Sequence, residues 1–144
     1  MNQEIPIETL IQKALEMLAF SYVPYSRYTV GAALLTKQGE IYTGCNIENA
    51  AYGPSNCAER TAFFKAISEG KKEFSAIAVV GGPNGTTEEY CMPCGVCRQV
   101  MVEFCDKDFK IIIAKSPKDY IVKNLEEILP FSFNPQDKIG ANAK

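Results

Sequence analysis

The sequence predicts an α/β domain in which helices cover a mixed β-sheet. Segments with helical spacing of apolar residues alternate along the chain with short apolar runs that are typical of strands. The first two strand candidates are separated only by the turn 'TKQG', which indicates a hairpin and hence an antiparallel pair in the sheet. With 144 residues, the chain is long enough to form a single domain over 1–144 with a buried core.

Amphipathic spacing and breaker residues define the elements of the first half of the chain. Pro6 is suited to the first turn of a helix, apolar residues then recur with helical spacing, and Pro24 ends that segment. Gly70 is placed where a later helix would stop. The predicted elements are a helix over 6–19, strands over 28–35 and 40–47, and a helix over 57–70.

The second half of the chain predicts two buried strands and two further helices. The runs 'FSAIAVV' and 'FKIIIA' are apolar throughout, whereas 'GGPNG' is expected to be a loop. A short last helix should begin near Lys123 or Asn124 and close at Pro130. The predicted elements are strands over 74–80 and 109–114, helices over 94–105 and 122–130, and a loose tail over 135–144.

Composition and charge argue against several classes of partner. The net charge is −2 and the longest basic run is Lys71-Lys72, so we expect no nucleic-acid partner. No apolar run approaches the roughly 20 residues of a membrane span, so we expect no membrane partner. The first residues lack the pattern of a signal peptide, and we therefore expect a cytoplasmic protein in which the six cysteines form no disulfide framework.

The chain contains no histidine, which restricts the chemistry that it can perform. Imidazole can serve neither as a metal ligand nor as a proton shuttle. Acid–base catalysis near neutral pH therefore falls to a carboxylate, a cysteine, a lysine or a tyrosine. A site for a soft metal must be built mostly from thiolates.

Three cysteines at predicted helix starts form a candidate metal site. Cys94 and Cys97 open one helix and lie on the same side of it, and Cys57 opens another. Free backbone N–H groups and the helix dipole favour the thiolate at such positions. If the two helix starts converge on one ion, they provide three thiolates and leave one coordination position open, which distinguishes catalytic from structural zinc.

The same cysteines allow three other interpretations. Free cysteines are often small buried hydrophobes, and we adopt this interpretation for Cys45 and Cys105. The C-x-x-C pair could be a redox pair, although that leaves Cys57 without a role. A closed structural zinc site could take Cys91 or Cys45 as its fourth thiolate, and spacing alone does not exclude it.

Glu59 favours the catalytic interpretation. It stands two residues after Cys57, where a structural metal site has no use for a carboxylate. Beside metal-activated water, a carboxylate can accept a proton and return it to a substrate nitrogen, which is the chemistry of hydrolytic deamination. Taken alone, Glu59 could simply complement the positive end of a helix. Together with 'PCGVC', the catalytic role is the stronger interpretation.

The motifs 'CAER' and 'PCGVCRQ' resemble those of the zinc-dependent cytidine deaminases. Three further segments, 'YVPYSRYTVGAAL', 'GCNIENAAYG' and 'ILPFSF', resemble other signature segments of the small homotetrameric members, in the same order. The resemblance extends from the first helix to Phe133. It implies a three-layer α/β/α sandwich with a mixed sheet of roughly five strands.

The resemblance also implies a reaction and a role for each residue of the metal site. Cys57, Cys94 and Cys97 would hold one Zn²⁺ per subunit, and Arg60 would hydrogen-bond their sulfurs. Hydroxide formed at the metal would attack C4 of cytosine while Glu59 shuttles protons. Cytidine and deoxycytidine would become uridine and deoxyuridine with release of ammonia, as a step of pyrimidine salvage. Without the resemblance, Arg60 could be an ordinary solvated helix charge.

Substrate contacts are implied in the same way. Asn46 and Glu48 would hold the ribose hydroxyl, and Tyr28 replaces a phenylalanine that usually stacks on the pyrimidine. Cys91 and Phe131 also depart from the smaller residues usual in the family. The full set of implied substrate-binding residues is Tyr28, Asn46, Glu48, Ala50, Tyr52, Ala58 through its backbone, and Phe133. Of these, Ala50, Tyr52 and Phe133 would come from neighbouring subunits of a homotetramer.

Several of these residues have a simpler interpretation without the resemblance. Asn46 could bond its own backbone in a turn, and Tyr52 and Phe133 could be aromatic core residues. Two alternatives to the reaction itself also stay open. One is deamination of another aminopyrimidine or of a base within a polynucleotide. The other is a non-catalytic, zinc-stabilised module, which predicts four sulfurs around the metal.

Overall fold

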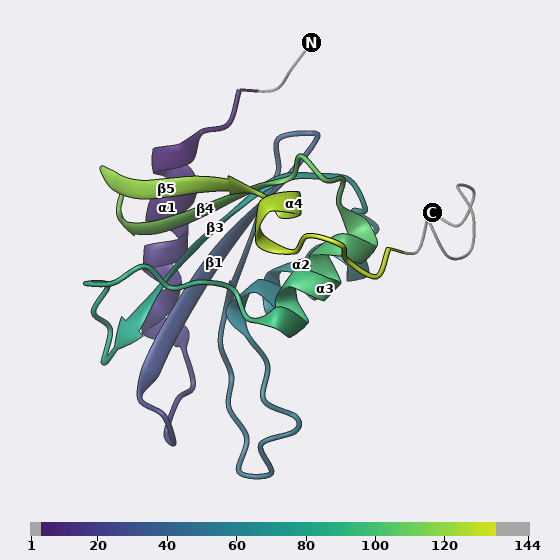
Figure 1. Cartoon of the computed structure of the whole chain (residues 1–144). Coiled ribbons are helices and arrows are strands. Elements are labelled where there is room, and N and C mark those ends of the chain that lie inside the picture. Colours follow the sequence, from purple (N-terminus) through teal and green to yellow (C-terminus); the bar gives the residue numbers. More distant parts are fainter. Residues whose placement is uncertain (1–3, 135–144) are drawn as a thin grey trace.

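The fold is a five-stranded mixed sheet between helical layers, as a computed structural model of the chain shows for residues 4–134 (Figure 1). The strand order is β2-β1-β3-β4-β5, and only the β3–β4 pair is parallel. The strands are β1 Tyr28–Thr36, β2 Ile41–Cys45, β3 Phe74–Pro83, β4 Lys110–Ser116 and β5 Asp119–Asn124. The helices are α1 Ile7–Glu16, followed by a 3-10 turn Met17–Phe20, then α2 Ala58–Ser68, α3 Gly95–Phe104 and α4 Leu125–Ile128.

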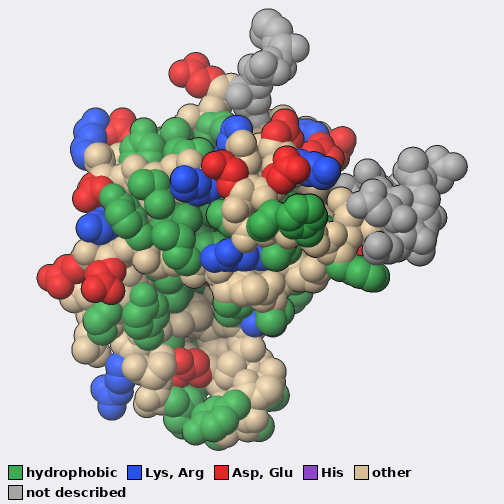
Figure 2. All heavy atoms as spheres, in the orientation of Figure 1, with side chains coloured by type: hydrophobic (Ala, Val, Ile, Leu, Met, Phe, Trp, Pro, Cys, Tyr) green, Lys and Arg blue, Asp and Glu red, His purple; other side chains and the backbone are tan. Residues whose placement is uncertain are grey.

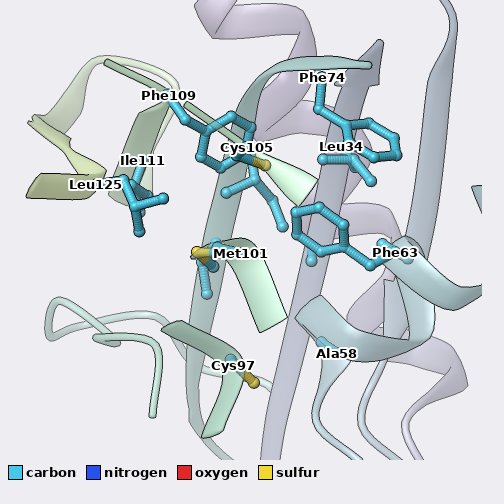
Figure 3. Close-up of a cluster of buried hydrophobic side chains, with 14 of the residues drawn as sticks. Leu34, Ala58, Phe63, Phe74, Cys97, Met101, Cys105, Phe109, Ile111 and Leu125 are labelled. Carbon is cyan, nitrogen blue, oxygen red and sulfur yellow. The ribbon is translucent and has the colours of Figure 1, made fainter. Parts of the chain in front are cut away.

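The sheet separates two hydrophobic cores, which confirms the predicted three-layer α/β/α sandwich. Strand β1 alternates between them: Ala33 and Leu35 face α1, whereas Ala32 and Leu34 face α2 and α3. Phe63 of α2 belongs to the larger core (Figure 3), and its ring centroid lies 5.1 Å from that of Phe74. The helices that carry the candidate metal ligands therefore share one face of the sheet.

A glycine on β2 allows α2 to approach the sheet closely. A Cβ atom added at Gly44 would lie 2.4 Å from the carbonyl oxygen of Ala58 and 2.6 Å from the backbone nitrogen of Ala62. Only a residue without a side chain permits this contact. Gly44 therefore fixes the height of the first turn of α2 above the sheet.

The expected helix over 122–130 is wrong at its start. Val122 and Lys123 belong to the edge strand β5, which pairs antiparallel with β4. Helix α4 begins only after Asn124, whose side chain and that of Glu127 form a capping box. Apolar residues at 122, 125, 128 and 129 also suit a helix, so sheet pairing overrides a helical pattern.

The expected loop 'GGPNG' is also partly wrong, because its first three residues extend β3. Gly81 and Gly82 pair with Val30 and Thr29 of β1, and Pro83 ends the strand. The chain folds back over these glycines: a Cβ atom at Gly82 would lie 2.2 Å from the carbonyl oxygen of Thr86. The two glycines therefore serve close packing within a strand. The first helix is shorter than expected, because regular α-helix ends at Glu16.

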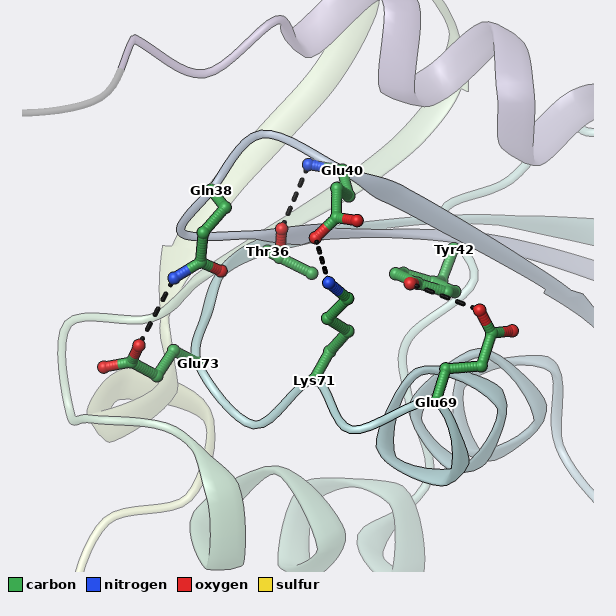
Figure 4. A network of polar contacts seen from close by, with 7 residues as sticks. All are labelled: Thr36, Gln38, Glu40, Tyr42, Glu69, Lys71 and Glu73. Carbon is green, nitrogen blue, oxygen red and sulfur yellow. Dashed lines mark hydrogen bonds and ion pairs between the residues drawn. The ribbon is translucent and has the colours of Figure 1, made fainter.

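A polar network ties the β1–β2 turn to the connection between α2 and β3 (Figure 4). Lys71 lies 3.0 Å from the Glu40 carboxylate, and Gln38 donates to Glu73 over 3.3 Å. This network holds the hairpin against the far end of α2. On the face drawn in Figure 2, acidic and basic side chains are interspersed. Over 4–134, no helix is long and apolar enough to span a bilayer. The expected loose tail over 135–144 lies outside the described residues.

Candidate metal centre and pocket

Three cysteine sulfurs meet where the N-termini of α2 and α3 converge. Cys57 is the N-cap of α2, Cys94 is the N-cap of α3, and Cys97 lies in the first turn of α3. The Cys94 sulfur lies 3.6 Å from that of Cys57 and 3.4 Å from that of Cys97. All three sulfurs lie within 4.8 Å of one another. Thiolates around a tetrahedral zinc ion stand roughly 3.8 Å apart, so this donor set fits that metal.

Positive charge and hydrogen-bond donors surround the sulfurs. Arg60 donates from Nη2 to the Cys57 sulfur over 3.3 Å, and its interactions with Cys57 and Cys97 raise the pKa of the guanidinium. A hydrogen bond from Cys97, together with the Arg60 guanidinium, lowers the pKa of Cys57 to about 5. The backbone N–H of Cys97 donates to the Cys94 sulfur over 3.5 Å. Arg60 thus faces the sulfurs rather than acting as a solvated helix charge.

Glu59 is a buried carboxyl group beside the sulfurs. It lies in the first turn of α2 and is only 3% exposed. Burial raises its pKa to about 7, and the negative charge of Cys57 adds to this effect. Cys97 and the Arg60 guanidinium act in the opposite direction and lower this pKa. A carboxyl group with a pKa near neutrality is suited to both accepting and donating a proton.

Cys57, Cys94 and Glu59 line a pocket of about 330 Å³ on this side of the sheet, and Cys97 lies behind them. Six of its lining residues are predicted site residues: Asn46, Glu48, Cys57, Glu59, Arg60 and Cys94. The others were not predicted as substrate contacts: Val30, Ser55, Asn56, Cys91 and Met92. Four of these five lie within the three residues before Cys57 or before Cys94 in the sequence. Proximity to the ligands was the signal that could have identified them.

The remaining cysteines lie apart from the group of three sulfurs. Cys45 and Cys105 are 7% and 6% exposed, which confirms their interpretation as core residues. Cys91 lines the pocket, but among the described residues the sulfurs close enough to share an ion are those of Cys57, Cys94 and Cys97. Burial raises the pKa of Cys91 to about 11, so it favours the neutral thiol.

Asn46 and Glu48 hold the start of β1 as well as lining the pocket. Asn46 accepts from the backbone N–H of Val30 over 2.9 Å and donates to the carbonyl of Tyr28 over 2.8 Å. Its side chain therefore bonds a neighbouring strand rather than its own turn. The Glu48 carboxylate accepts from the backbone N–H groups of Tyr25 and Ser26, both over 3.1 Å. A hydrogen bond from the Ser26 hydroxyl lowers the pKa of Glu48.

The other five predicted substrate contacts, Tyr28 and Ala58 among them, do not line this pocket. Ala58 is buried at the start of α2, and Tyr28 is 37% exposed at the start of β1. Ala50 and Tyr52 belong to the long loop between β2 and α2, which extends from the body of the domain (Figure 1). Tyr52 and Phe133 are 75% and 66% exposed, so their interpretation as core residues is wrong. Ala50, Tyr52 and Phe133 do not line the pocket of their own chain.

Arg98 and Gln99 of 'CRQ' hold the segments next to the site in place, a role that the sequence did not predict. Arg98 donates to the carbonyl of Pro93 over 2.8 Å and to that of Ile128 over 2.6 Å, which joins the loop before Cys94 to α4. Gln99 donates to the carbonyl of Phe133 over 2.9 Å. The segment after α4 is thus attached to the helix that carries two of the sulfurs.

Comparisons with known proteins agree with this geometry. Residues 5–113 match the model of the cytidine and deoxycytidylate deaminase zinc-binding region. The chain is 45% identical to a cytidine deaminase of Sporosarcina psychrophila, over 91% of this chain and 93% of the relative. It is 48% identical to that of Halalkalibacterium halodurans, over 90% and 96%. The crystal structure of cytidine deaminase from Burkholderia pseudomallei aligns with a TM-score of 0.79 at 43% identity, over 87% of this chain and 97% of that one.

Proposed function

Because the chain belongs to the family of zinc-binding cytidine and deoxycytidylate deaminases, we propose that its pocket deaminates free cytidine and deoxycytidine. The products are uridine or deoxyuridine and ammonia. The observation that carries this proposal is the buried Glu59 carboxyl, which lines one pocket together with two of the three clustered sulfurs. An acid of this kind next to a site for one Zn²⁺ is the arrangement that hydrolytic removal of an amine requires.

Cys57, Cys94 and Cys97 are the proposed ligands of one Zn²⁺ per chain. When bound, the ion supplies the Lewis acidity that produces a nucleophile from water near neutral pH. Three thiolates bring one more negative charge than the ion neutralises, which opposes this effect. Arg60 and the N-termini of α2 and α3 withdraw that charge from the sulfurs.

Glu59 is the proposed proton shuttle. In this role its carboxylate accepts the proton of the attacking water and delivers it to the ring nitrogen of the pyrimidine. It then takes the proton of the hydroxyl group now on C4 and gives it to the amine, which leaves as ammonia. A pKa of about 7 supports the proposal, because neither transfer then carries a large free-energy penalty at neutral pH.

Asn46 and Glu48 are the proposed contacts of the ribose. Both line the pocket, and each retains hydrogen-bonding capacity after its contacts to the β1 region. An amide keeps one donor hydrogen and one acceptor lone pair, and a carboxylate keeps further acceptor sites. These groups favour a nucleoside over a free base, since a base offers no hydroxyl to them.

A homotetramer is the proposed assembly, with Ala50, Tyr52 and Phe133 completing the pockets of neighbouring subunits. The high exposure of Tyr52 and Phe133 supports this proposal, because large apolar side chains gain most when a partner covers them. We also propose a cytoplasmic location. All six cysteines are free, and thiolate ligands require a compartment that keeps them reduced.

Turnover of a nucleoside panel tests the proposed function. We expect cytidine and deoxycytidine to lose their amine, with the absorbance change of a uracil product and release of ammonia. Glu59→Gln should reduce kcat by at least about 100-fold, the usual size of a general acid–base contribution, and keep its zinc. Glu103→Gln, at an exposed position of α3, is the matched control. Undiminished turnover by Glu59→Gln would exclude the proposed role of this carboxyl.

A further inference from the structure

Glu48 lines the pocket with a carboxylate that three hydrogen-bond donors hold. Its Oε1 accepts from the backbone N–H groups of Tyr25 and Ser26, both over 3.1 Å. Its Oε2 accepts from the Ser26 hydroxyl. A carboxylate offers about four acceptor positions, so these three donors leave little more than one for a substrate. Because both oxygens are engaged, the carboxylate is fixed in one orientation at the pocket wall.

The Ser26 hydroxyl is itself oriented by the backbone. It accepts from the N–H of Tyr28 over 3.0 Å. A hydroxyl has one proton to donate and an ionised carboxylate can only accept, so the proton of the Ser26 hydroxyl points to Glu48. This hydrogen bond is the main cause that lowers the pKa of Glu48. The orientation of an ionised pocket residue therefore depends on a single hydroxyl group.

The backbone around this contact is fixed on both sides. Tyr22 accepts from the N–H of Glu48 over 2.8 Å and donates to the carbonyl of Asn46 over 3.0 Å. The turn that follows Tyr22 is closed by the N–H of Arg27, which donates to the carbonyl of Val23 over 3.0 Å. Arg27 has a φ of 59°, a left-handed conformation that persists only where neighbouring contacts hold it. The hydroxyl and the carboxylate therefore meet from two anchored segments.

We propose that Ser26 is a positioning residue for sugar recognition: its hydroxyl holds the Glu48 carboxylate in the orientation that accepts a hydroxyl of the nucleoside. The inference rests on the proposed function, because it names the group that orients a ribose contact of the same pocket. Ser26 does not line the pocket and acts only through Glu48. It therefore affects KM, and only for substrates that carry the hydroxyl which Glu48 binds.

Substrate analogues distinguish this role from a general loss of structure. Ser26→Ala should raise KM for cytidine about three- to tenfold, the range expected for one lost hydrogen bond, with kcat altered less than about twofold. On either 3′-deoxycytidine or 5′-deoxycytidine, whichever lacks the hydroxyl that Glu48 binds, the rise should be less than about twofold. An analogue that is not turned over is measured as a competitive inhibitor of cytidine turnover.

Two further variants complete this experiment. Ser26→Thr retains the hydroxyl and should keep the KM of the wild type. Ser68→Ala removes an exposed hydroxyl at the end of α2 and is the matched control, with no change of KM on any of the three nucleosides. An equal rise in KM on all three nucleosides for Ser26→Ala would overturn the proposal, and so would a Ser26→Ala protein with the KM of the wild type for cytidine.

Amide hydrogen exchange tests the contact without any activity. In Ser26→Ala, the amides at positions 25 and 26, which donate to Glu48, should exchange several-fold faster, as NMR on the zinc-loaded protein can measure. Ser68→Ala should leave both rates unchanged. If Ser26→Ala also leaves them unchanged, the hydroxyl does not hold the carboxylate and the positioning role fails. If the wild type does not deaminate cytidine, the proposed function fails, and the exchange rates still decide whether Ser26 holds Glu48.

Discussion

At the scale of single residues, the charge around the three sulfurs governs how well a zinc ion bound there could activate water. Arg60 is a cation that donates to the Cys57 sulfur over 3.3 Å. Three thiolates make a divalent zinc site formally negative, which reduces its ability to activate water. The guanidinium offsets this charge through hydrogen bonds that Lys could not reproduce in the same planar geometry.

Replacement of Arg60 should therefore impair catalysis while the fold survives. We expect Arg60→Gln to lower kcat/KM for cytidine by about 10- to 100-fold, the usual effect of losing a group that supports metal ligands. Lys65→Gln, on the same helix but bonded to Thr43, should stay within about twofold of the wild type. Steady-state kinetics with zinc quantified on each sample provides the measurement. Equal kinetics for the two variants would contradict this role of Arg60.

Residue types, helix starts and the absence of histidine led to a thiolate metal site with Glu59 beside it. The choice of Cys57, Cys94 and Cys97 over a closed site with Cys91 or Cys45 came from the resemblance to the deaminases. Other contacts depend on where separate strands meet, which spacing along the chain does not encode. Cys91 is the example, because its place in the pocket wall depends on the approach of its sulfur to Gly81 of β3.

At the scale of elements, the seating of α2 on the sheet positions half of the site. Cys57, Ala58 and Glu59 all belong to its N-cap and first turn. That turn lies so close to β2 that a Cβ atom at Gly44 would approach the Ala58 carbonyl oxygen to 2.4 Å. Any side chain at this position must push the turn away from the sheet, and the first sulfur with it.

Gly44→Ala is accordingly expected to damage both stability and metal binding. Overpacking of this kind costs about 1–3 kcal/mol, which thermal or urea unfolding can measure. Zinc retained after dialysis should fall below one ion per chain as Cys57 moves. Gly95→Ala is the control, because a Cβ atom there meets nothing within 4 Å. A Gly44→Ala protein with the stability and zinc content of the wild type would show that α2 is not held by this contact.

Elements with a strong periodic pattern were predicted well, and those decided by tertiary pairing were not. The hairpin, α2, α3 and the core strands follow from local pattern, and all are found. Strand β5 was missed because its residues also continue the apolar spacing of α4. By pairing with β4, it satisfies the outward-facing backbone groups of that strand. Asn124 then caps the helix that follows. Gly81 and Gly82 were likewise expected to form a loop. They lie in β3, where the absence of a side chain allows neighbouring atoms to pack closely.

At the scale of the whole molecule, a single chain leaves part of the proposed pocket incomplete. The loop between β2 and α2 extends away from the sheet, and hydrophobic side chains lie at its end in Figure 2. Tyr52 is 75% exposed there, and Phe133 is 66% exposed beyond α4. A partner subunit that covers these side chains would bury apolar surface and bring them to a neighbouring pocket.

Light scattering should therefore report four chains per particle in solution. Tyr52→Ala should raise KM for cytidine at least about fivefold, since truncation of an aromatic interface residue costs on the order of 1–2 kcal/mol. Tyr120→Ala, on the edge strand β5, is the control. A monomer with full activity, or a Tyr52→Ala variant with the KM of the wild type, would contradict the proposed assembly.

X-ray absorption at the zinc edge tests the central claim most directly, because it counts the sulfur atoms bound to the ion. The claim is that Cys57, Cys94 and Cys97 supply all the protein ligands. We predict three sulfurs at roughly 2.3 Å and one lighter ligand, with one zinc per chain, in the wild type and equally in Cys91→Ala. Four sulfurs in the wild type, or a protein that binds no zinc, would contradict the account.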